Sequence, residues 1–93
     1  MKVQKIELPR NKKEQLKIIN ETQNNILYFR PKGFPSGATF KYNNVILEEV
    51  FVDIPTGLKG TGMRTKKEYA FYFQDGSYEV WTDPVFIKLE QII

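Results

Sequence analysis

Cysteine and histidine are both absent from this chain of 93 residues. Without cysteine the protein forms no disulfide and has no thiolate nucleophile, and the usual zinc ligand sets are excluded. Its stability must then come from packing, as in a reducing setting. Without histidine it lacks the commonest general base and the commonest metal ligand. The composition therefore predicts a protein that is not an enzyme and that holds no cofactor and no metal.

Long apolar runs are also missing. Residues 1–8 contain no apolar stretch of signal-peptide length, and no later run is long enough to span a bilayer. We therefore expect a soluble, cytoplasmic protein without a membrane segment. A chain of this length builds one modest core, so residues 1–93 are predicted to form a single domain.

Positive charge is in slight excess and is clustered. The chain has 14 Lys and Arg residues against 11 Asp and Glu residues, a formal net charge of +3. Residues 1–19 are rich in lysine, and residues 55–67 contain Lys59, Arg64, Lys66 and Lys67 with no acid. Such clusters can face a polyanion, although most charge runs are simply solvated surface.

The strongest structural signal is a β-hairpin over residues 67–81. Two alternating aromatic runs flank Asp75-Gly76, which suits a type I′ turn with positive φ at both central residues. That register pairs Phe73 with Tyr78 and Phe71 with Val80, and it places Tyr72 and Trp81 together on the face opposite the apolar side chains. Two large aromatic rings on a face that would otherwise be polar indicate a binding surface.

The rest of the chain consists of short strand patterns separated by proline, glycine and asparagine. Strands are expected at residues 3–8, 26–30, 38–42, 45–54 and 85–89. The apolar phase changes at Glu48-Glu49, so a bulge or bend is expected there, and Phe86 is expected to face away from Leu89. Residues 11–20 fit either a short helix capped by Asn11 or a strand. Together these patterns predict an all-β or β-dominated fold, a small antiparallel barrel or sandwich of the OB or SH3 type with at most one short helix near residues 11–20.

Two patterns that suggest catalysis fail on inspection. Gly57 and Gly62 have the spacing of a phosphate-binding loop, but Met63 and Arg64 stand where that loop needs Lys and then Ser or Thr. Glu49 and Asp53 share one face of a strand, but the strand rise separates them by about 13 Å, too far for a catalytic pair. Neither pattern supports an enzyme.

Residues 27–89 resemble a cold-shock domain in the order and spacing of their aromatic segments, and that family implies single-stranded nucleic-acid binding by stacking. The matching segments are 27–29, 32–34, 50–53, 64–65 and 71–73, whereas the first 25 residues have no counterpart in the family. Residues 27–40 are in addition similar to the β-region of the minor pseudopilins of type II secretion. The long apolar N-terminal helix that defines those proteins is absent here.

The aromatic and basic residues predict a nucleic-acid-binding module. Bases of a single strand would stack on exposed rings while Lys and Arg meet phosphates. The alternative is a small accessory or assembly subunit, an inhibitor or structural component, whose free strand edges and Tyr72/Trp81 face bind a protein partner or a second copy. The predicted nucleic-acid-binding residues are Tyr72, Trp81, Tyr28, Phe34, Arg30, Lys59, Arg64, Lys66 and Lys67.

Overall fold

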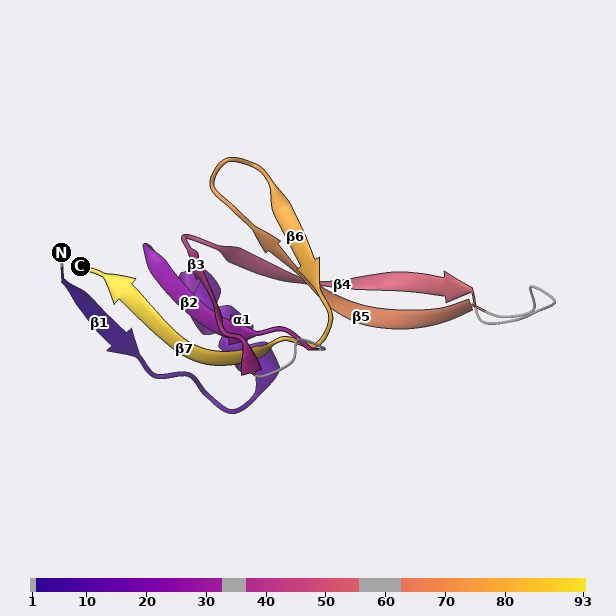
Figure 1. Cartoon of the computed structure of the whole chain (residues 1–93), viewed down its shortest axis with the longest axis horizontal. Coiled ribbons are helices and arrows are strands. Elements are labelled where there is room, and N and C mark those ends of the chain that lie inside the picture. The colour runs from indigo at the N-terminus through magenta and orange to yellow at the C-terminus, as the bar shows by residue number, and fades with distance from the viewer. Residues whose placement is uncertain (1, 33–36, 56–62) are drawn as a thin grey trace.

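The computed structural model describes residues 2–32, 37–55 and 63–93, without the side chains of residues 54, 55, 63 and 64 (Figure 1). The elements in chain order are β1 (Val3–Ile6), α1 (Lys12–Glu21), β2 (Asn25–Arg30), β3 (Phe40–Asn43), β4 (Ile46–Pro55), β5 (Met63–Tyr72), β6 (Tyr78–Trp81) and β7 (Val85–Ile92). The prediction of a β-dominated fold with one short helix is confirmed. None of the described helical residues belongs to a segment that could cross a membrane.

The strands form two antiparallel sheets. Sheet A has the order β1-β7-β2-β3, and sheet B has the order β4-β5-β6. Over the described ranges both sheets stay open, so the sandwich alternative describes the structure better than a closed barrel.

The ambiguous segment at residues 11–20 is helical. The side chain of Asn11 accepts hydrogen bonds from the backbone N–H groups of Lys13 and Glu14 at 2.8 and 3.2 Å, which is the N-cap geometry that its position suggested. Leu16 and Ile19 lie three residues apart and are the buried residues of α1. The helix therefore packs one apolar side on the core.

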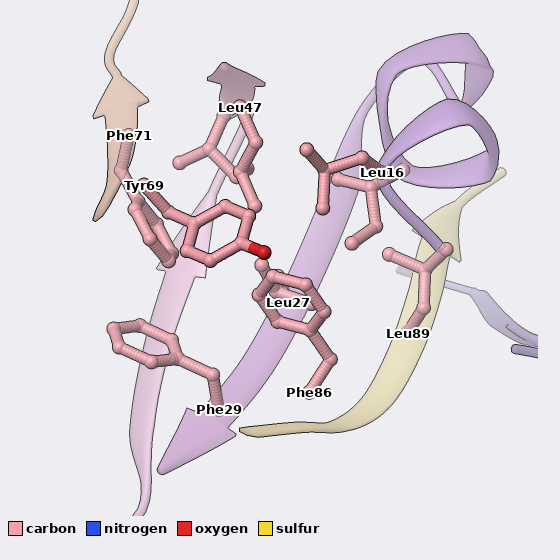
Figure 2. Packing of buried hydrophobic residues seen from close by; sticks show 10 residues of the cluster. Leu16, Leu27, Phe29, Leu47, Tyr69, Phe71, Phe86 and Leu89 are labelled. Atoms are coloured by element: carbon pink, nitrogen blue, oxygen red, sulfur yellow. The ribbon is translucent and has the colours of Figure 1, made fainter. Parts of the chain in front are cut away.

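A single cluster of buried side chains joins the helix and both sheets. Figure 2 shows Leu16 of α1 with Leu27 and Phe29 of β2, and with aromatic rings from β5 and β7. Phe29 is fully buried, and its ring centroid lies 4.7 Å from that of Phe71. The cluster consists of Leu16, Ile19, Leu27, Phe29, Val45, Leu47, Tyr69, Phe71, Phe86 and Leu89.

The β5–β6 hairpin has a different register from the predicted one. Tyr72 pairs with Tyr78 and Tyr69 with Trp81, one residue away from the pairing expected for a two-residue turn. The amide of Gly76 donates to the carbonyl of Phe73 at 3.1 Å, and Gly76 alone of the two turn residues has a positive φ, 90°. The connection is thus a longer turn with glycine in the left-handed position. Asp75 instead accepts hydrogen bonds from the amide and hydroxyl of Ser77 at 2.8 and 2.5 Å.

A shift of one residue moves the side chains of one strand to the other face of the sheet. Trp81 consequently lies on the core side of sheet B, across from Tyr69, and not beside Tyr72. The prediction that Tyr72 and Trp81 share a face is wrong.

The expected bulge lies in a different strand. β4 pairs with β5 in one unbroken register from Ile46 to Pro55, so of the bulge or bend expected at Glu48-Glu49 the bulge is not found. The register shift occurs between β2 and β7, where Tyr28 pairs with Lys88 and Phe29 with Phe86. The extra residue on β7 lets Phe86 and Leu89 both face the core, against the expectation that they face opposite ways.

Beyond the body of the molecule β4 and β5 continue as a two-stranded ribbon, which Figure 1 shows projecting away from the other strands. We call residues 50–55 and 63–68 the arm. β6 pairs with β5 only over residues 69–72, so the arm has no third strand among the described residues. The extents of the molecule, 57 × 30 × 25 Å, reflect this projection.

Two carboxamides cover the outer edge of β4 next to the body. The Asn25 side chain donates to the carbonyls of Ile19 and Val45 at 3.0 and 2.9 Å and accepts from the amide of Val45 at 2.9 Å. The Asn20 side chain exchanges both hydrogen bonds with the backbone of Leu47, at 2.8 and 2.9 Å. These side-chain amides therefore make the hydrogen bonds that the backbone of a neighbouring strand would otherwise make with residues 45 and 47.

Candidate functional site

The residues predicted to bind nucleic acid do not form one site. Phe34, Lys59 and the side chain of Arg64 lie outside the part of the chain that the structure describes. The described members occupy three surfaces: Tyr28 and Arg30 on the outer face of sheet A, Tyr72 and Lys66 on the outer face of sheet B, and Trp81 and Lys67 on the core-side face of sheet B.

Trp81 packs between the edge strands of the two sheets. Its ring centroid lies 5.9 Å from that of Phe29 and 5.4 Å from that of Phe40, both in edge-to-face geometry. Its Nε1 donates to Oε2 of Glu79 at 3.2 Å. The indole is half-buried and joins β6 to β3, which gives it a structural role.

Tyr42 reinforces the same junction. Its hydroxyl donates to the Glu79 carboxylate, and its ring lies 5.0 Å from the rings of Phe29 and Phe73. Burial, and next the hydrogen bond to Glu79, raise the pKa of Tyr42 to about 12. The folded state thus favours the neutral phenol.

We expect the stability of the protein to fall as the pH rises from about 10 to about 12. The unfolded phenol ionises near pH 10, whereas the pKa of Tyr42 in the folded protein is about 12, so deprotonation in this window favours the unfolded state. Urea unfolding at about pH 9 and about pH 11.5 measures the loss. The variant Tyr42→Phe should show a smaller loss over this interval, and an unchanged loss would contradict the assignment.

The outer face of sheet B carries exposed apolar side chains on all three strands. Ile46, Tyr72, Tyr78 and Val80 have exposed fractions of 49%, 37%, 62% and 41%. They are contiguous, because Ile46 pairs with Tyr72, Tyr72 pairs with Tyr78, and Val80 adjoins Tyr78 along the face. Their exposure shows that no described element covers them.

Acidic groups accompany this apolar face. The hydroxyl of Tyr72 donates to Oε1 of Glu48 at 2.8 Å, and this hydrogen bond raises the pKa of Tyr72. Glu68 lies farther along the same face and faces Lys66 at 4.0 Å. Phosphate groups would therefore meet the Glu48 carboxylate and the Lys66–Glu68 ion pair here.

The outer face of sheet A carries more basic side chains, together with Glu90, which lies 3.5 Å from Lys88. Tyr28 lies between two cations, with Nζ of Lys88 4.7 Å and Nζ of Lys41 5.9 Å from its ring centroid. Its hydroxyl donates to Oε1 of Glu90 at 3.0 Å, and this bond raises its pKa. Arg30 extends the same strand face and is exposed. This face combines one aromatic ring with several basic side chains.

Of two surface hollows, one offers little chemistry, and the other is lined by Glu7, Glu14, Lys17 and Glu21 as well as by apolar residues. One, of about 330 Å³, is lined mainly by carboxamides, which neither take up nor release protons near neutral pH. Another, of about 500 Å³, lies between α1 and residues 7–9. Among the described residues no group of three or more Asp and Glu side chains is placed to hold a metal ion.

Comparisons with protein families, with curated proteins and with solved structures give no match for this chain.

Several residues of these surfaces were not predicted from the sequence. Tyr78 and Val80 were assigned to the apolar wall because the predicted register paired them with Phe73 and Phe71. Lys41 and Lys88 are far apart in the chain. Both lie next to Tyr28 because β3 and β7 each pair with β2.

Proposed function

We propose that the chain is a non-enzymatic protein-interaction module that binds another protein through the outer face of sheet B. The observation that carries this proposal is the contiguous exposed apolar surface of Ile46, Tyr72, Tyr78 and Val80. An antiparallel sheet that faces water on one side is ordinarily polar on that side, and contiguous exposed apolar surface rimmed by polar groups is typical of interaction sites.

Aromatic composition and charge support the same conclusion. Tyrosine is enriched at protein interfaces because it has an apolar ring and a polar end. Tyr72 and Tyr78 stack with ring centroids 5.9 Å apart, so they present a joint surface. The neighbouring Glu48 and Glu68 favour a protein partner over a polyanion.

Site-specific photocrosslinking tests this proposal. A photoreactive amino acid placed at position 80, in cells that express the chain, is expected to yield a protease-sensitive adduct with another polypeptide. The matched control is position 41, an exposed residue on the outer face of sheet A. No adduct from position 80, or an equal adduct from both positions, would refute the assignment of the partner to this face.

A second candidate function is single-stranded nucleic-acid binding through the outer face of sheet A. The arrangement of Tyr28 between Lys41 and Lys88, with Arg30 on the same face, supports it. Binding of a labelled oligonucleotide should then weaken steeply with added salt and should be lost in Lys41→Glu/Lys88→Glu. Lys66→Glu, on sheet B, serves as the control and should bind like the unaltered protein.

A further inference from the structure

The arm has an unpaired strand edge. Residues of an antiparallel strand direct their N–H and C=O groups alternately to one neighbour and to the other. The N–H and C=O groups of Leu47 face away from β5, because both bond the Asn20 side chain. Glu49, Phe51 and Asp53 follow at intervals of two residues, so their N–H and C=O groups also face away from β5. Within the described residues no other strand pairs with this edge.

The side chains along this edge have a symmetric pattern of charge. The sequence Glu49-Val50-Phe51-Val52-Asp53 consists of three apolar residues between two acids. Phe51 is 66% exposed and Val52 is 40% exposed. Glu49 has one cationic neighbour, Lys67 at 3.9 Å, whereas Asp53 forms no ion pair with the described side chains. An isolated two-stranded ribbon is marginal in water, so this exposure favours a third strand.

A second copy of the chain is a poor occupant for this edge. Antiparallel pairing of two copies about Phe51 would place Glu49 of one copy opposite Asp53 of the other, and like charges directly opposite destabilise a sheet. No segment of this chain has three apolar residues between two basic residues. Charge complementarity therefore favours a strand from a different protein.

We infer that the outer edge of β4 at residues 49–53 takes up an extended segment of a partner protein in which three apolar residues lie between two Lys or Arg residues. The segment adds a strand to the arm: its backbone bonds Glu49, Phe51 and Asp53, and its cations lie opposite the two acids. This inference rests on the proposed function, and it names the chemistry of the partner at a second surface of the same sheet.

The test uses the peptide acetyl-Lys-Val-Phe-Val-Lys-amide with the full chain, observed by NMR. We expect peptide binding to shift the amide signals of Phe51 and Asp53 and to slow their hydrogen exchange. The variant Glu49→Lys/Asp53→Lys should bind this peptide roughly tenfold more weakly, because both cross-strand charge pairs are reversed. The same variant should instead bind acetyl-Glu-Val-Phe-Val-Glu-amide.

A pair of substitutions at position 51 separates backbone pairing from side-chain contact. Phe51→Pro removes the outward N–H without removing a hydrogen bond to β5, so the arm should persist while peptide binding is lost. Phe51→Ala removes the ring and keeps the N–H, so binding should weaken but remain detectable. Equal loss in both variants would show that the backbone edge is not used.

Three further results would overturn the inference: no binding at millimolar peptide, signal changes outside the arm, or concentration-dependent changes at residues 49–53 without peptide, which would identify a second copy as the occupant. Each of these leaves the crosslink from position 80 unaffected. The proposed function and the inference about the arm can therefore fail separately.

Discussion

Replacement of Asn25 by alanine is expected to lower the free energy of unfolding by about 4 kcal/mol. The Asn25 side chain makes three buried hydrogen bonds, to the carbonyls of Ile19 and Val45 and from the amide of Val45, and it is 2% exposed. Alanine leaves these three backbone groups without a partner, and each such group costs about 1–3 kcal/mol when buried. The loss is expected to be large because Asn25 connects α1, β2 and the start of β4.

Urea denaturation followed by far-UV circular dichroism measures this effect. The matched control is Asn43→Ala, an exposed asparagine in β3, which should change the stability by less than about 0.5 kcal/mol. A loss below about 1 kcal/mol for Asn25→Ala would mean that water or a backbone rearrangement replaces the missing amide.

Replacement of Trp81 by alanine is expected to lower the free energy of unfolding by about 3 kcal/mol. The indole packs on Phe29 and Phe40, and its removal leaves space between the edges of the two sheets and deprives Glu79 of a donor. The estimate lies at the low end for Trp→Ala because the ring is half-buried.

Tyr78→Ala provides the control for Trp81→Ala, since Tyr78 is an aromatic residue of the same strand that is 62% exposed. It should change the stability by less than about 0.5 kcal/mol. Thermal and urea unfolding by circular dichroism compare the two variants without relying on tryptophan fluorescence. Equal stability of Trp81→Ala and the unaltered protein would show that the indole is not structural.

Local patterns in the sequence predicted much of the fold. Prolines and asparagines marked the ends of most strands, because turns depend on a few neighbouring residues. Asn11 was recognised as a possible helix cap, but the choice between helix and strand at residues 11–20 was left to the structure. The β-branched and aromatic residues at 26–30 correctly predicted a strand, and the structure shows that Leu27 and Phe29 of this strand face the core.

The candidate site was less predictable because it depends on register. Asp75-Gly76 is compatible with more than one hairpin turn, and the choice between them decides whether Trp81 faces the core or the solvent. The same limitation applies to β7, where one extra residue opposite Tyr28/Phe29 turns Phe86 inward.

The sequence by itself determined the absence of thiol and imidazole chemistry, the β-dominated class and the positions of the turns, since these follow from composition and from short-range preferences. Only the tertiary structure decided which faces of the strands are covered. Pairing between distant strands sets those faces: it joins Lys41 and Lys88 around Tyr28, buries Trp81 against β3, and leaves the outer face of sheet B and the edge of the arm open.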